Sequence, residues 1–127
     1  MDDATVSLEL PWPPSQLSPN KRLHWSKVAK AKKKYRETCY LETMLMMQQP
    51  RNQEDLGDGN LVLELTFVRP DRRSYDRDNL IARMKAGIDG ACDALGFDDK
   101  RFATVIANVD PSQVMSPGMV IMKIKGE

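Results

Sequence analysis

The chain has 127 residues, of which 41% are hydrophobic and 29% are charged. These are the proportions of a globular protein, and the length suits one domain over residues 1–127, which excludes a disordered or fibrous chain. The formal net charge is only +1, so the overall balance of charge indicates no partner.

The cysteine and histidine content excludes two further classes of protein. Cys39, Cys92 and His24 are too few for a four-ligand zinc site of the usual kind and provide no disulfide framework. We therefore expect a reduced, intracellular compartment. The Met-Asp-Asp start lacks the features of a secretory signal, and no apolar stretch approaches the ~20 residues of a membrane helix.

The first half of the chain predicts a strand and a long helix. Apolar and polar residues alternate over 5–10, as in a half-buried strand, and a proline-rich segment follows. Residues 15–25 are expected to form a loop. A segment free of glycine and proline then predicts a helix over 26–48, with Ser26 as its N-cap.

The second half predicts a strand, a helix and two strands. Alternation over 61–68 indicates a strand, and the spacing of apolar residues predicts a helix over 78–95 that ends at Gly96. Two more strands are expected over 103–109 and 119–125, joined by a turn that contains Pro111, Ser116, Pro117 and Gly118. The order β-α-β-α-β-β predicts an α+β fold, with a single mixed sheet of about four strands and two helices packed on one face.

Carboxylates gather at both ends of the second predicted helix. Asp76 and Asp78 are two apart in an expected extended segment, so they share a side, and Asp98 and Asp99 follow the helix. If the chain brings these pairs together, they form an oxygen-only site that favours Mg²⁺ or Mn²⁺. The alternative is structural: an aspartate caps a helix start, and Asp98-Asp99 is an ordinary solvated turn.

Lys85 is seven residues after Asp78, on the same face of the predicted helix. A lysine at this position can reach a phosphate or a leaving oxygen beside a metal ion. The alternative is an i,i+4 ion pair with Asp89.

A basic tract spans residues 21–36 and contains no acid. Its cations are Lys21, Arg22, Lys27, Lys30, Lys32, Lys33, Lys34 and Arg36. Such a loop and helix suit a phosphate backbone, and the alternative is a solvated helix face. A second basic set, Arg69, Arg72, Arg73 and Arg77, adjoins the first carboxylates. Trp12 and Trp25 are interpreted as hydrophobic anchors, with base stacking as the alternative.

The motifs as a group resemble those of a known family. The run from Pro70 to Leu80 (PDRRSYDRDNL) and the later Gly96-Phe97-Asp98-Asp99 resemble the RusA-like Holliday junction resolvases, which are crossover junction endodeoxyribonucleases. The opening LPWPPS at residues 10–15 is also similar. The resemblance covers nearly the whole chain.

The resemblance implies a homodimer that binds four-way DNA junctions and nicks two strands symmetrically with Mg²⁺, in the cytoplasm of a bacterial or phage-infected cell. It implies that Asp76, Asp78 and Asp99 are the essential carboxylates, with Asp98 beside them. In one spacing seen in the family, a functional lysine stands one helical turn after the second aspartate of the motif, and that position is Ala82 here. Lys85, one turn further along the helix, is expected to take that role. Lys21, Arg22, Lys27, Lys30, Lys32, Lys33, Lys34, Arg72, Arg73 and Arg77 are expected to contact DNA.

Two other functions stay open at this point. One is a DNA-binding module without catalysis, in which the carboxylates are helix caps. The other is a metal-dependent nuclease for flaps, forks or other branched DNA. A small-molecule phosphohydrolase is less well supported, because it gives the lysine tract no role.

Overall fold

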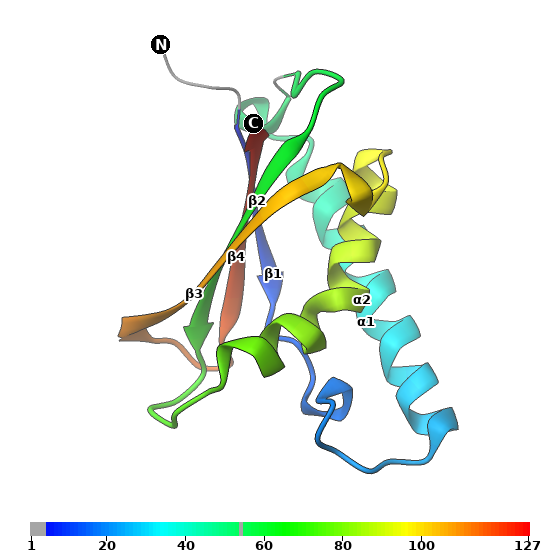
Figure 1. Cartoon of the computed structure of the whole chain (residues 1–127), viewed down its shortest axis with the longest axis vertical. Coiled ribbons are helices and arrows are strands. Elements are labelled where there is room, and N and C mark those ends of the chain that lie inside the picture. The colour runs from blue at the N-terminus through cyan, green and yellow to red at the C-terminus, as the bar shows by residue number, and fades with distance from the viewer. Residues whose placement is uncertain (1–4, 54) are drawn as a thin grey trace.

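The computed structural model describes residues 5–53 and 55–127. The strands are β1 (Thr5–Pro11), β2 (Leu61–Arg69), β3 (Phe102–Val114) and β4 (Met119–Gly126), and the helices are α1 (Trp25–Met46) and α2 (Arg77–Leu95). Three short 3₁₀ turns lie at Ser15–Leu17, Pro50–Asn52 and Asp99–Arg101. Both helices cover one face of the sheet, so the predicted α+β architecture is confirmed (Figure 1).

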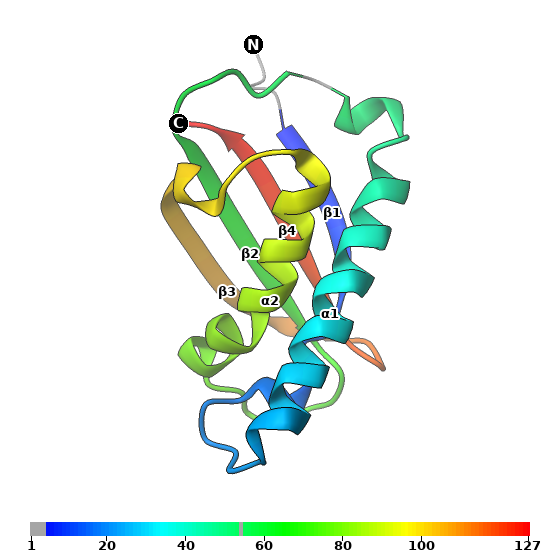
Figure 2. The same ribbon diagram turned by 90° about the vertical axis from the view of Figure 1, so that its right-hand side faces the viewer.

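The sheet is mixed, with the strand order β1-β4-β2-β3. The last strand, β4, lies between β1 and β2 and is antiparallel to both. β3 pairs with β2 in parallel, because α2 forms the crossover between them. β1 and β3 are therefore the two edges, and Figure 2 shows the helices in front of the sheet, with β3 at its outer side.

The hydrophobic core lies between the sheet and the helices, as the alternation predicted. The inward residues of β1, Val6, Leu8 and Leu10, are buried, as are Leu61, Leu63, Leu65 and Phe67 of β2. The predicted apolar stripe of α2, Leu80, Met84, Ile88 and Ala91, is buried against them. From α1, Tyr35 and Cys39 reach the core.

Two glycines allow α1 and α2 to pack closely. A Cβ atom at Gly87 would lie 2.5 Å from Cε2 of Tyr35, and one at Gly90 would overlap the backbone carbonyl oxygen of Arg36. Since the backbone of α1 occupies the space of a side chain at Gly90, the helices approach most closely at this level.

Three predicted ends were wrong, two of them in α1 and one in β3. The N-cap of α1 is His24, whose Nδ1 accepts a hydrogen bond from the Ser26 amide, so Ser26 lies inside the helix. α1 ends at Met46, two residues before the predicted end. β3 continues through Pro111 to Val114, since an edge strand tolerates a residue without an N–H donor.

Candidate nucleic-acid interface

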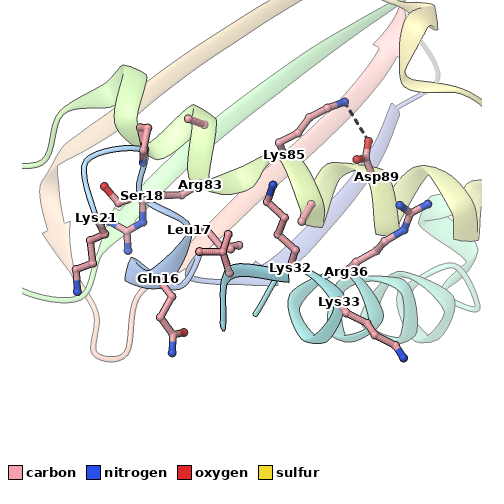
Figure 3. Close-up of a pocket in the computed structure, with 14 residues that line it drawn as sticks. Gln16, Leu17, Ser18, Lys21, Lys32, Lys33, Arg36, Arg83, Lys85 and Asp89 are labelled. Atoms are coloured by element: carbon pink, nitrogen blue, oxygen red, sulfur yellow. Dashed lines mark hydrogen bonds and ion pairs between the residues drawn. The ribbon is translucent and has the colours of Figure 1, made fainter. Parts of the chain in front are cut away.

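A cleft of about 720 Å³ lies between α1, α2 and the segment 16–21 (Figure 3). Six of its lining residues carry a cationic group and one is acidic. The lining consists of Gln16, Leu17, Ser18, Pro19, Lys21, Val28, Lys32, Lys33, Arg36, Ala82, Arg83, Lys85, Ala86 and Asp89. The cleft is therefore strongly positive, although the whole chain is nearly neutral.

Helical periodicity on two neighbouring helices produces this cleft. Val28, Lys32 and Arg36 are four residues apart on α1 and share one face. On α2, Ala82 and Ala86 are also four apart, and their small side chains leave room between the helices.

The segment 16–21 closes the cleft on its third side and is tied to α2. Asn79 Nδ2 donates to Ser18 Oγ at 2.9 Å. The guanidinium of Arg83 donates to the backbone carbonyl oxygens of Pro13 at 2.6 Å and Pro14 at 3.3 Å. Arg83 is only 8% exposed and lies 5.9 Å from the ring centroid of Trp12, so it is mainly an anchor for this segment.

The cations of the cleft differ in how far they are already paired. Arg36 forms an ion pair with Asp93 at 2.6 Å. Lys32 and Lys33 form no ion pair with any residue of the described ranges, 5–53 and 55–127. Lys32 extends from α1 toward α2, whereas Lys33 points outward (Figure 3). These two lysines of α1 are therefore available to an incoming phosphate, as is Lys21, whose Nζ donates only to Ser15 Oγ at 3.3 Å.

Lys85 is held between two carboxylates at one end of the cleft. Its Nζ lies 3.0 Å from Asp89 Oδ1 and also forms a short ion pair with Asp99 Oδ2. The predicted i,i+4 pair with Asp89 is confirmed. The hydrogen bond to Asp99 raises the pKa of Lys85, and the same bond lowers the pKa of Asp99.

Cys92 lies near Lys85, Asp89 and Asp99, and its thiol is unreactive. Burial is the main cause that raises the pKa of its thiol to about 12, and the charges of Asp99 and Asp89 add to it. At neutral pH the thiol is therefore protonated, which makes Cys92 a core residue rather than a nucleophile.

The first carboxylate pair lies at the opposite end of α2. Asp76 is the N-cap, and its Oδ1 accepts hydrogen bonds from the amides of Asp78 at 2.8 Å and Asn79 at 3.3 Å. Asp78 is in the first turn, and its side chain is 86% exposed. The structural alternative for Asp76 is thus the one observed, and Asp78 is helical rather than extended.

Within one chain, the structure keeps the two pairs of predicted carboxylates apart. Over the 19 residues of α2 the helix axis extends about 28 Å, with Asp76 and Asp78 at its start and Asp98 and Asp99 after its end. Within the part of the chain that the structure describes, no group of three His, Cys, Asp or Glu side chains can hold a metal ion. The pair Asp76 and Asp78 therefore does not share a site with Asp98 and Asp99 of the same chain. Lys85 also turns toward Asp99 and not back toward Asp78.

The residues predicted to contact DNA are divided among several surfaces. Lys21, Lys32 and Lys33 line the cleft. The exposed side chains of Arg22, Lys27, Lys30 and Lys34 lie outside its lining. Arg72, Arg73 and Arg77 belong to the segment before α2, where Arg73 pairs with Asp71 at 3.5 Å and Arg77 with Asp78 at 3.8 Å.

Some residues play roles that the sequence patterns did not indicate. Arg83 belongs to no pattern in the sequence that marks it as the anchor of residues 13–14. Trp12 is an anchor as predicted, with its ring 5.2 Å from that of Tyr75. Trp25 is not, because 76% of it is exposed, beside the ring of His24. The exposed indole is free to stack on a nucleobase.

These observations define an α+β protein with a cationic cleft between two helices. Neither helix in the described residues is long and apolar enough to cross a membrane. Comparison with other sequences finds an uncharacterized protein of Xylella fastidiosa (strain Temecula1) that is 40% identical over 120 residues, covering 94% of this chain and 76% of the relative. The chain belongs to the same family as this bacterial protein. No family model matches the chain.

Proposed function

We propose that the protein is a Mg²⁺-dependent, structure-selective endodeoxyribonuclease that resolves four-way DNA junctions by paired symmetric nicks, in DNA recombination and repair. The proposal joins the resemblance of residues 70–80 and 96–99 to RusA-like resolvases with the position and charge of the cleft. Its place of action is the cytoplasm of a bacterial or phage-infected cell, where such junctions arise.

The observation that carries the proposal is the run of cations along the cleft. Lys21 of the preceding loop and Lys32 and Lys33 of α1 line the cleft, and lysines of this kind attract the phosphates of a DNA backbone. The exposed Trp25 lies at the start of the same helix, where a splayed base can stack on it. A flexible or branched backbone enters such a cleft more readily than a rigid duplex.

The carboxylates stand at the two ends of α2. Asp76 and Asp78 lie at one end of α2 and Asp99 at the other, and we derive no step from a shared metal ion. The cation at the Asp99 end is Lys85, whose ammonium neutralises charge on a phosphate once its pairing with Asp99 is released. Arg72, Arg73 and Arg77 supply positive charge at the other end, beside the N-terminus of α2.

A cleavage assay tests this proposal directly. Synthetic four-way junctions, Y-forks and linear duplexes are incubated with the protein in Mg²⁺ or in a chelator. We expect paired nicks in the junction only with Mg²⁺, and loss of nicking in Asp78→Asn and in Asp99→Asn with binding retained. Asp58→Asn, in the exposed loop before β2, makes the same chemical change as a control. Wild-type nicking by Asp78→Asn would show that this carboxylate is not catalytic.

A second function is favoured by one specific observation, the use of Asp76 as a helix cap. If the carboxylates are structural, the protein is a branched-DNA-binding module without catalysis. The same assay separates the two functions, because a binding module leaves the junction intact in Mg²⁺ and in chelator while still retarding it in a gel. Equal cleavage of forks and junctions would instead indicate a nuclease for branched DNA in general.

A further inference from the structure

A second pocket, of about 560 Å³, lies where the parallel strands β2 and β3 end. Arg69 and Arg72 form one side of it, and residues 111–115 form the other. None of these residues lines the cleft between α1 and α2. Figure 1 shows the end of β3 at the same end of the sheet as the loop that follows β2. Ligands commonly bind beyond the carboxyl ends of parallel strands.

A bulge in β3 builds one side of this pocket. Opposite the single residue Val68 of β2, β3 has four residues, 110–113. These residues are held in a turn, because the amide and the hydroxyl of Ser112 both donate to Asp110 Oδ1, at 2.8 and 2.7 Å. Bulges of this kind often lie beside functional sites, where they redirect the strand and its side chains.

The charge of the pocket lining is unbalanced. Arg69 and Arg72 are cationic, and no acidic residue lines the pocket. Neither arginine forms an ion pair with any residue of 5–53 or 55–127. Asp71 and Asp110 are nearby, but hydrogen bonds from the amides two residues further along the chain are the main cause that lowers the pKa of each, and the charge of Arg69 adds to it. Both carboxylates are thus engaged in turns outside the lining.

The guanidinium of Arg69 is incompletely hydrogen-bonded. It donates to the backbone carbonyl oxygens of Arg73 and Pro111, and both bonds are long, at 3.3 Å. Its Nε is buried and has no hydrogen-bond partner within the part of the chain that the structure describes. Because a buried donor without an acceptor is unfavourable, an anion that draws this guanidinium toward the pocket stabilises it. Arg72 is exposed, so its side chain can close on the same anion.

We propose that this pocket binds the terminal phosphate of a nucleotide, held between the guanidinium groups of Arg69 and Arg72. Guanidinium groups pair with phosphate oxygens through two parallel hydrogen bonds. A phosphomonoester carries roughly −1.5 to −2 charge near neutral pH, so two arginines match it better than they match the single charge of a phosphodiester. Val114 and Met115, which are 42% and 46% exposed, offer an apolar surface to the sugar and the base.

Such a phosphate has two sources, a free nucleoside monophosphate and the end of a DNA strand. The second source rests on the proposed function, because hydrolysis of a phosphodiester leaves a phosphate on one new strand end and a hydroxyl on the other. The pocket itself needs neither the cleft nor the carboxylates of α2.

An NMR titration of the isotope-labelled protein with deoxyadenosine 5′-monophosphate, in chelator, locates the binding site. We expect saturable shifts of the Ser112 and Gln113 amides and of the Nε–H resonance of Arg69, which is shielded from solvent. Dimethyl phosphate, a diester with one charge, is expected to shift the same resonances only at higher concentration. Shifts confined to the cleft, or no saturable shift over residues 112–115, would overturn the proposal.

Two neighbouring arginines provide matched variants, Arg72→Gln and Arg73→Gln. Each variant removes one exposed charge from the same loop, but Arg73 lies outside the pocket lining and pairs with Asp71. We expect Arg72→Gln to weaken binding of the mononucleotide about tenfold, the effect of one charge-assisted hydrogen bond. Arg73→Gln should weaken it by less than about twofold, since salt screens a charge outside the site. Equal losses in the two variants would overturn the pocket in favour of diffuse positive charge.

Short single DNA strands with a phosphate at the 5′ end, at the 3′ end or at neither end distinguish the two sources. Tighter binding of a phosphorylated strand than of the mononucleotide, with shifts at residues 112–115, assigns the DNA end, and equal or weaker binding assigns the free nucleotide. Phosphate binding by a protein that leaves junctions intact would refute the nuclease and keep the pocket. Junction cleavage without any shift at residues 112–115 would refute the pocket and keep the nuclease.

Discussion

Replacing Lys32 and Lys33 by alanine removes two cleft cations of α1 that have no ion-pair partner in the described residues. If each contacts one phosphate, the double variant releases two fewer counterions when it binds DNA. The slope of log affinity against log salt concentration then becomes shallower by about 1.8, at ~0.9 per phosphate. Between roughly 50 and 200 mM salt, the advantage of the wild type over the variant shrinks about 12-fold.

The matched control is Lys30→Ala with Lys34→Ala. It removes the same charge from the same helix, but these two lysines lie outside the lining of the cleft. Fluorescence anisotropy with a labelled four-way junction, in chelator so that no strand is cut, measures both slopes. We expect the control pair to change the slope by less than half as much. Equal slopes for the two variants would refute a role of the cleft, and would return the whole tract to a diffuse positive surface.

Three further predictions concern stability and the charge of the site. Gly90→Ala is expected to lower the free energy of unfolding by about 2 kcal/mol in urea titrations, because overpacking costs ~1–3 kcal/mol and exceeds the gain in helix propensity. As a control, Ala82→Gly at an exposed position of the same helix should lower it by only about 1 kcal/mol. A Gly90→Ala variant more stable than the wild type would contradict the close packing of the helices. Asp76→Ala should cost about 1 kcal/mol as a lost N-cap, and an unchanged stability would refute that role. Because Lys85 lowers the pKa of Asp99, their ion pair stabilises the fold fully above the ordinary aspartate pKa of about 4, and this stabilisation is lost as the pH falls through the lower pKa of the folded state. In an NMR titration, the midpoint of Asp99 should rise in the Lys85→Met variant. An unchanged midpoint would contradict the pairing.

The elements of the fold could be predicted because each has a strong local pattern. The alternation in β1 and β2 and the apolar stripe of α2 are readable from the chain alone, and the left-handed backbone at Gly96 ends α2 as predicted. The strand order was not readable, since nothing local indicates that β4 inserts between β1 and β2. Pairing across the sheet depends on long-range contacts, which no single segment encodes.

Only those parts of the candidate site that depend on local sequence patterns could be predicted. The lysine tract and the Lys85–Asp89 pair follow from composition and helical spacing. The cleft itself needs two helices and a loop, and its third side depends on Arg83 and Asn79, whose contacts are made with residues more than 60 positions away. The two carboxylate pairs are not brought together within one chain, because the 19 residues of α2 separate them and β3 begins at the far end of this helix.

The charge of the Lys85 group leads to a last prediction, about binding rather than cleavage. One lysine between Asp89 and Asp99 leaves a net charge of −1 at this end of an otherwise positive cleft. A phosphate drawn along the lysines is therefore repelled where the cleft meets the group of Lys85, Asp89 and Asp99.

Asp99→Asn removes that negative charge and releases Lys85 from one partner. A unit charge ~8 Å away in water contributes about 0.5 kcal/mol, so the variant should bind a junction about twofold more tightly in chelator. Anisotropy measures the change, with Asp58→Asn as the control. If Asp99→Asn binds more weakly than the wild type, phosphate does not approach this end of the cleft, and Asp99 instead stabilises the bound state through Lys85.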